Sequence, residues 1–124
     1  MNSQLVKENG KLYENVYKSG GLYGEAIDQI IFWLEKANAV AENDAQRNYT
    51  NLLIDYYKTG DLKTWDEYNV AWVQDSVSVI DYVNGFIEDY GDPMGMKATW
   101  EAVVNFKDME ATKRSSLISQ NAQW

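Results

Sequence analysis

A helical repeat of apolar residues begins at Glu25 and continues through the middle of the chain, which limits the folds that the chain can adopt. Between Glu25 and Ala41, apolar side chains recur every three or four residues, as in an amphipathic helix. They are Ile27, Ile30, Ile31, Leu34, Ala37 and Ala41. The next segment repeats the pattern up to Gly60, a residue type that commonly follows a helix end. Asn43 and Gln46 have the spacing of a capping box at its start.

A third helix is predicted to begin at Thr64, because Thr64 and Glu67 have the spacing of a second capping box. Large aromatic residues on the helices are predicted to lie in the core: Trp33, Trp65, Tyr68 and Trp72. Residues 3–18 show only loose helical spacing, interrupted by Gly10, and predict a short or broken helix. Helices joined by such short connections are expected to pack antiparallel.

The sequence changes character near residue 75. "VSVIDYVNGFI" is rich in β-branched residues, which favour strands, and the stretch 91–95 contains the only proline and two glycines. We predict two strands, at about 79–90 and 98–106, and a final helix capped by Asp108. The predicted fold class is therefore α+β and mainly helical, with three to four packed helices, a two-stranded β segment and a C-terminal helix.

The chain is predicted to be a single domain or a domain fragment with three parts: a helical part (1–75), a β segment (76–107) and the C-terminal helix (108–124). Two strands alone make a marginal sheet with two open edges. We therefore expect one of three arrangements: a third strand comes from elsewhere, the chain dimerises, or the chain is a segment of a larger protein. The ending "ISQNAQW" carries no helix stop signal and favours the last.

The charge and the missing residue types exclude several functions. With 19 acidic and 11 basic side chains, the net charge is −8, which disfavours nucleic acid and anionic membranes as partners. The absence of histidine and cysteine excludes Ser–His–Asp triads, Cys–His pairs and imidazole-ligated zinc within the chain. A cysteine-free chain with neither a bilayer-spanning run nor a secretory signal is predicted to be cytoplasmic.

Glu88 and Tyr90 are the candidate binding residues. Two positions apart on a strand, they are predicted to share a face with Phe86. The carboxylate suits a cation, and the phenol suits a carbonyl or an oxyanion. Spacing alone favours an ordinary solvated strand face over this site. Asp89 and Asp92 indicate turn chemistry rather than a calcium loop, since the other oxygen ligands are missing.

Two alternatives stay open at this point. Glu101 on the second strand is expected to pair with Lys97 or to lie near Glu88, and two adjacent carboxylates would suit a zinc-independent hydrolase. A free-standing acidic domain that binds a partner, or a second copy, through its exposed strand edges is the other alternative.

The segment "VNGFIEDYGDPMGMKATWEAVVNFKD", residues 83–108, resembles the dipeptidyl peptidase III family through the pattern "GFIE-x-Y-x-DP-x-G". The flanking stretches "AENDAQR" (41–47), "YYKTGDLKTWDEY" (56–68) and "WVQD" (72–75) are also similar to that family. The likeness extends over essentially the whole chain and is greatest to bacterial members of the Bacteroides type. It implies an internal segment of a larger, two-lobed enzyme.

The resemblance also implies a function. The family removes dipeptides from free N-termini with a zinc ion held by an H-E-x-x-G-H-type motif and a downstream glutamate, and this chain lacks that motif. We expect no cofactor and no catalytic residue here, zinc in the full-length parent, and an inactive isolated chain. By motif position, Glu88 would hold the substrate's amino end and Tyr90 would hydrogen-bond the peptide near the scissile bond. The expected partners are the peptide and the remainder of the parent enzyme.

Overall fold

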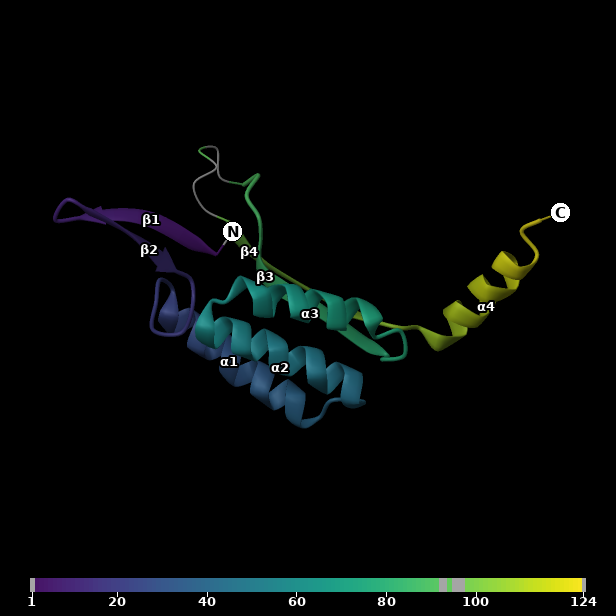
Figure 1. Cartoon of the computed structure of the whole chain (residues 1–124). Coiled ribbons are helices and arrows are strands. Elements are labelled where there is room, and N and C mark those ends of the chain that lie inside the picture. The colour runs from purple at the N-terminus through teal and green to yellow at the C-terminus, as the bar shows by residue number, and fades with distance from the viewer. Residues whose placement is uncertain (1, 92–93, 95–97, 124) are drawn as a thin grey trace.

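The computed structural model describes residues 2–91, 94 and 98–123. In chain order the elements are β1 (Ser3–Glu8), β2 (Lys11–Val16), α1 (Gly24–Ala39), α2 (Asp44–Thr59), α3 (Leu62–Gln74), β3 (Ile80–Glu88), β4 (Thr99–Phe106) and α4 (Met109–Gln120). Helices α1 to α3 lie side by side, and the β3–β4 hairpin lies along them. The β1–β2 hairpin and α4 extend from opposite ends of this body (Figure 1). The mainly helical α+β class is confirmed.

The predicted ends of α2 are confirmed. The Asn43 side-chain oxygen accepts a hydrogen bond from the Gln46 backbone N–H at 2.9 Å. The Gln46 side chain in turn accepts one from the Glu42 N–H at 2.6 Å, so two N–H groups at the helix start are satisfied. Gly60 ends the helix in the left-handed conformation, at φ 73°, and donates its N–H to the Tyr56 carbonyl.

The predicted start of α3 was wrong. The helix begins at Leu62, and its cap is Asp61, whose carboxylate accepts the Lys63 N–H at 3.0 Å. The Thr64 hydroxyl, predicted to be the cap, instead donates to Asp61 at 3.2 Å. A carboxylate is a strong hydrogen-bond acceptor, and its negative charge is stabilised by the positive end of the helix dipole. Asp61 therefore caps the helix in place of Thr64.

The predicted N-terminal helix was also wrong, because residues 3–16 form the antiparallel β1–β2 hairpin. Asn9 and Gly10 connect the strands with positive φ angles of 50° and 80°. Positive φ at both central residues defines the type I′ turn, whose twist matches a hairpin and which favours Asn-Gly. This local turn preference overrides the loose helical spacing of residues 3–18.

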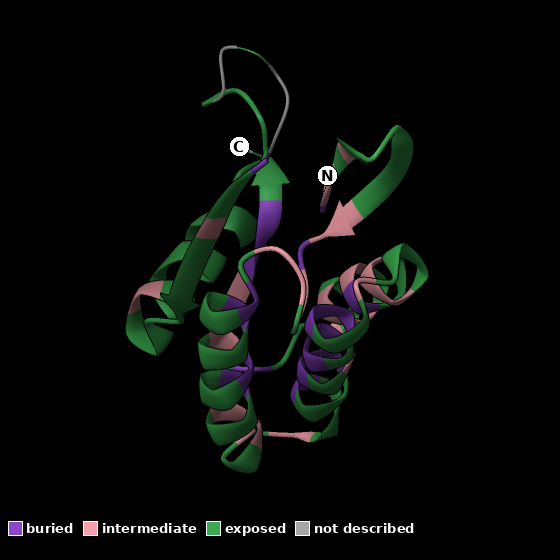
Figure 2. Cartoon of the chain, turned by 90° about the vertical axis from the view of Figure 1, so that its left-hand side faces the viewer, coloured by how far each residue is buried: buried purple, intermediate pink, exposed green. Residues whose placement is uncertain are grey.

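The core lies between the inner faces of the helices and the β3–β4 hairpin, where Figure 2 shows buried residues facing one another. Its largest members are Tyr17, Ile27, Ile31, Leu34, Tyr49, Leu53, Ile54, Tyr56, Tyr57, Tyr68 and Phe86. The prediction that Trp33 is a core residue was wrong, since its side chain is 66% exposed. Position 33 falls beside the apolar stripe of α1 rather than on it. Trp65 and Trp72 are half-buried against the core.

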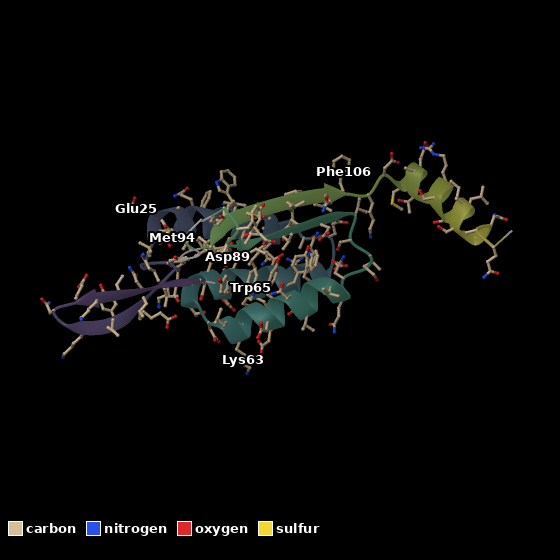
Figure 3. All side chains as sticks on the ribbon, turned by 90° about the horizontal axis from the view of Figure 1, so that it is seen from above. Glu25, Lys63, Trp65, Asp89, Met94 and Phe106 are labelled. Carbon is tan, nitrogen blue, oxygen red and sulfur yellow. The ribbon has the colours of Figure 1, made fainter. Side chains whose placement is uncertain are left out.

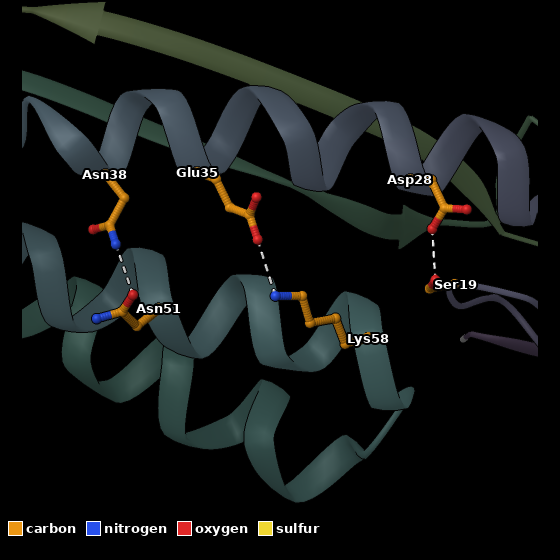
Figure 4. Close-up of polar contacts among 6 residues, drawn as sticks. All are labelled: Ser19, Asp28, Glu35, Asn38, Asn51 and Lys58. Carbon is orange, nitrogen blue, oxygen red and sulfur yellow. Dashed lines mark hydrogen bonds and ion pairs between the residues drawn. The ribbon is translucent and has the colours of Figure 1, made fainter.

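Polar contacts on the helix surfaces support this packing. Three pairs join α1 to α2 and to the loop before α1: Asn38–Asn51, Glu35–Lys58 and Asp28–Ser19 (Figure 4). Both partners of the Glu35–Lys58 ion pair are about half exposed, at a distance of 3.0 Å. Exposed pairs of this kind add little to stability, so the helices are held together mainly by their buried faces.

The β3–β4 hairpin is antiparallel and contains one irregularity. Phe86 lies opposite Trp100, but Glu88 lies opposite Thr99, so Ile87 is an extra residue on β3. An extra residue of this kind is a β-bulge, which bends the strand and resets the alternation of its side chains. In the described part of the chain no third strand joins β3 and β4.

The start of β3 is tied to the α1–α2 connection by Glu42. Its carboxylate oxygens accept the backbone N–H groups of Val79, at 2.9 Å, and of Ile80, at 2.7 Å. These two hydrogen bonds hold the pKa of Glu42 below its ordinary value. A lowered pKa means that the stabilisation is complete above the ordinary carboxyl pKa, about 4.3, and is lost as the pH falls through the folded-state value.

Glu42→Gln is therefore expected to lower the urea midpoint of unfolding at pH 7, because a neutral amide is a weaker acceptor for two N–H groups. It should also reduce the loss of stability between about pH 5 and 3, since no charge at this position remains to be titrated. Urea unfolding of both proteins across this range measures the effect. Parallel curves for the two proteins would contradict the role assigned to Glu42.

Helix α4 begins as predicted at Asp108, whose side chain accepts the N–H groups of Glu110 and Ala111 at 3.0 Å each. It contains no buried residue, and no other described helix or strand packs against it. Its position beyond the end of β4 is visible in Figure 1. The cap therefore fixes the start of α4, whereas tertiary packing contributes nothing to it within the described chain.

Candidate functional site

Glu88 and Tyr90 lie at one end of the β3–β4 hairpin. Glu88 is the last residue of β3 and is exposed, and among the described residues its carboxylate has no hydrogen-bond or ion-pair partner. Tyr90 is 80% exposed and lies in the turn that follows. The strand thus ends two residues before the predicted boundary. Because β3 ends at Glu88 and contains the bulge at Ile87, the three residues Phe86, Glu88 and Tyr90 do not share one strand face as predicted.

An aromatic anchor fixes β3 two residues before Glu88. The Phe86 side chain is 8% exposed, and its ring centroid lies 4.8 Å from that of Tyr17 and 6.1 Å from that of Tyr23. The Tyr23 ring is nearly parallel to Phe86, at 20°, and meets Tyr17 edge to face. Aromatic contacts of this kind add specific geometry to the burial of apolar surface. The contacts of Phe86 therefore fix the position of β3 two residues before Glu88.

A buried hydrogen-bond chain joins both strands to α2. The Tyr57 hydroxyl donates to the Asn84 side-chain oxygen at 2.7 Å and accepts the Trp100 indole N–H at 2.9 Å. Burial raises the pKa of Tyr57 well above its ordinary value, so the hydroxyl keeps its proton and remains a donor. These three residues could not be predicted from the sequence, because the partners lie 27 and 43 positions from Tyr57 and share no local pattern with it.

Tyr57→Phe is expected to lower the free energy of unfolding by about 2 kcal/mol, because the buried Asn84 oxygen loses its donor. The Trp100 indole, which is 39% exposed, can turn to water instead. Urea unfolding measures the change. Tyr23→Phe is the matched control, since that side chain is 45% exposed and its hydroxyl can be solvated. Equal effects of the two substitutions would contradict a specific role for the Tyr57 hydroxyl.

Helix α3 supports the hairpin through Trp65, which is labelled in Figure 3 and contacts β3 at Gly85. A methyl group at Gly85 would come within 2.6 Å of Trp65 Cη2, so only glycine permits this approach. The Trp65 ring is itself packed between Tyr56, at 4.8 Å, and Tyr68, at 5.2 Å, measured between ring centroids. The strand that carries Glu88 thus rests directly on the aromatic core.

The second candidate carboxylate, Glu101, is half-buried and lies opposite Gly85, whereas Glu88 lies opposite Thr99. The register therefore does not place the two carboxylates directly across from each other, as close acid–base work between them would require. Lys97, the other predicted partner of Glu101, lies outside the described residues.

The chain lacks the histidine and cysteine side chains that most often bind zinc. It contains no histidine or cysteine, and within the described residues no three acidic side chains converge to hold a metal ion. Asp89 follows directly after β3, and Asp92 lies outside the described residues. The donor set that zinc prefers is therefore missing from this segment.

Comparison with known proteins places the chain in a family. The model described as peptidase family M49 matches residues 2–124. The chain belongs to this family. Among M49 relatives, dipeptidyl peptidase 3 of Rattus norvegicus is 32% identical over 94 residues, which is 73% of this chain and 13% of the rat protein. Dipeptidyl peptidase 3 of Nematostella vectensis is 29% identical over 119 residues, or 94% of this chain and 16% of that protein.

Solved structures of DPP III share the fold. The structure of DPP III from Caldithrix abyssi is similar with a TM-score of 0.75 and 25% identity, over 95% of this chain and 22% of that one. DPP III from Corallococcus sp. strain EGB is similar with a TM-score of 0.74 and 19% identity, a likeness of fold alone. The chain thus corresponds to 22% or less of the length of these relatives.

Proposed function

We propose that this chain forms part of the peptide-binding site of an M49 dipeptidyl peptidase, in the lower of two lobes, and that Glu88 and Tyr90 are its substrate-binding residues. The observation that carries the proposal is the exposed Glu88 carboxylate, which has no partner among the described residues and lies at the end of a hairpin anchored by Phe86. Membership of the M49 family supports a peptide as the ligand.

The chemistry of the two side chains suits the amino end of a peptide. A carboxylate is the natural partner of an ammonium group, and a charge-assisted hydrogen bond contributes about 1.5–3 kcal/mol. The Tyr90 phenol, placed in the adjoining turn, would hydrogen-bond the peptide backbone. The net charge of −8 adds a general attraction for cationic ligands.

Zinc, held by residues outside this chain, would polarise the scissile carbonyl and activate water. The residues of this chain bind and orient the substrate. A peptide fixed at its amino end presents its bonds at defined distances from that end, so anchoring by Glu88 would select dipeptide-length products. The isolated chain is predicted to be inactive.

The test uses the full-length product of the gene, incubated with one peptide in two forms, with a free and with an acetylated amino terminus. Mass spectrometry of the products should show dipeptides released from the free form only. Release of single residues, or equal cleavage of the acetylated form, would contradict the proposal.

Several finer predictions accompany this proposal. A cytoplasmic location and a likeness to Bacteroides-type members remain predictions, as does pairing of two copies through the exposed strands. Within the described chain, no helix has both the length and the apolar character needed to cross a bilayer. The family match gives no support to a free-standing interaction domain.

A further inference from the structure

An apolar groove runs between α1 and the β3–β4 hairpin. It has a volume of about 510 Å³, and nearly all of the surface inside it is carbon. Apolar side chains line both walls. They include Ile30, Trp33 and Ala37 from α1, and Val83, Ala102 and Val104 from the hairpin. A groove of this kind binds an apolar partner, since it offers few polar groups to fix a charged one.

Strand β4, which forms part of the hairpin wall, has the alternating apolar sequence of a strand with one buried face. Every second residue of β4 is apolar, from Trp100 through Ala102 and Val104 to Phe106. Yet Val104 is 69% exposed and Phe106 is 79% exposed. A strand face that meets water in the native protein normally carries polar residues at these positions. Contiguous exposed apolar surface marks an interface.

Further apolar surface lies beyond both ends of the groove. A second hollow, of about 550 Å³, shares Ile30 and Trp100 with the groove and reaches Phe86 near the end of the hairpin. Beyond β4, helix α4 exposes Leu117 by 63% and Ile118 by 72%. Exposed apolar side chains thus occur at the hairpin end, along the groove and, separately, on the C-terminal helix.

We propose that the groove is the contact surface for an apolar segment of the same polypeptide lying outside residues 1–124. This inference shares with the proposed function only the requirement for a longer polypeptide. The related solved structures are several times longer than this chain, which covers 22% of their length, so polypeptide to cover the groove exists in the family. A second copy is a poorer occupant, since two chains of net charge −8 repel each other.

The test compares Val104→Glu with Val40→Glu in the full-length gene product. Both valines are largely exposed in this chain, at 69% and 80%, but only Val104 lines the groove. A glutamate forced under a covering segment loses its hydration, so Val104→Glu should lower Tm by about 5 °C or more, and Val40→Glu by about 1 °C or less. Equal shifts would overturn the inference.

A second measurement needs no variant. Hydroxyl-radical labelling of the full-length protein should modify Trp33 as slowly as a buried residue, although it is 66% exposed in this chain. Rapid labelling of Trp33 would overturn the inference. Protection that appears only as the protein sediments as a dimer would do the same, because the occupant would then be a second copy.

These results are separable from the proposed function. If Val104→Glu melts like its control while the protein still releases dipeptides, the groove inference fails and the function stands. If the protein releases no dipeptides but Val104→Glu is strongly destabilised, the function fails and the groove inference stands.

Discussion

Glu88→Gln in the full-length gene product is expected to weaken the binding of peptides with a free amino terminus by about 10- to 100-fold, the equivalent of losing a charge-assisted hydrogen bond. Glutamine keeps the size of the side chain but cannot neutralise an ammonium group. Glu88 is exposed and has no partner among the described residues, so the substitution should leave folding unchanged. The effect can be measured as a peptide dissociation constant by calorimetry.

Glu101→Gln is the matched control, because it makes the same chemical change on the neighbouring strand, opposite Gly85 rather than at the hairpin end. It should leave peptide affinity within about twofold of the unmodified protein, whereas a hydrolase based on both carboxylates would lose activity with either substitution. If Glu88→Gln weakened the acetylated peptide as much as the free one, Glu88 would not be the amine-binding group.

Gly85→Ala is expected to destabilise the fold by about 2–3 kcal/mol, the upper part of the range for inserting a methyl group into a packed core. The added carbon would lie 2.6 Å from Trp65 Cη2 and 3.0 Å from Cζ3. The indole cannot simply retreat, because Tyr56 and Tyr68 pack against it. Relief would require β3 to move away from α3, which would also shift Glu88, three residues further along.

A double-variant cycle identifies the cause. Trp65→Phe removes the outer atoms of the indole, so Gly85→Ala should cost markedly less in that background when both are measured by urea unfolding. Additive losses would show that the methyl group clashes elsewhere. The cycle separates the contact with Trp65 from any general intolerance of β3 to substitution.

The elements predicted correctly are those whose signals are local. The caps at Asn43 and Asp108 and the stop at Gly60 depend on residues within four positions, and all three occur in the structure. The errors at residues 3–18 and at the start of α3 arose where two local signals compete. Between residues 3 and 18 a loose helical spacing opposed one Asn-Gly turn, and the turn prevailed because it fixes two backbone conformations at once.

The candidate site also contains features that local sequence predicts and features that it does not. Glu88 and Tyr90 could be singled out from one short stretch of sequence. What holds that stretch in place could not be predicted, because Tyr57 meets Asn84 and Trp100 only after α2 and the hairpin have packed together. The bulge at Ile87 could not be predicted from the sequence either, since it depends on the pairing of β3 with β4 rather than on either strand alone.

The bulge also makes the number of residues in β3 a determinant of the site, separate from their identity. In an uninterrupted ladder, Glu88 would lie opposite Ala98 instead of Thr99, and its side chain would follow the alternation that directs Phe86 into the core. Ile87 interrupts that alternation between the two residues. Removing one codon here would change no chemical group at the hairpin end, but it would redirect the carboxylate, so sequence alignments of this segment must respect its length.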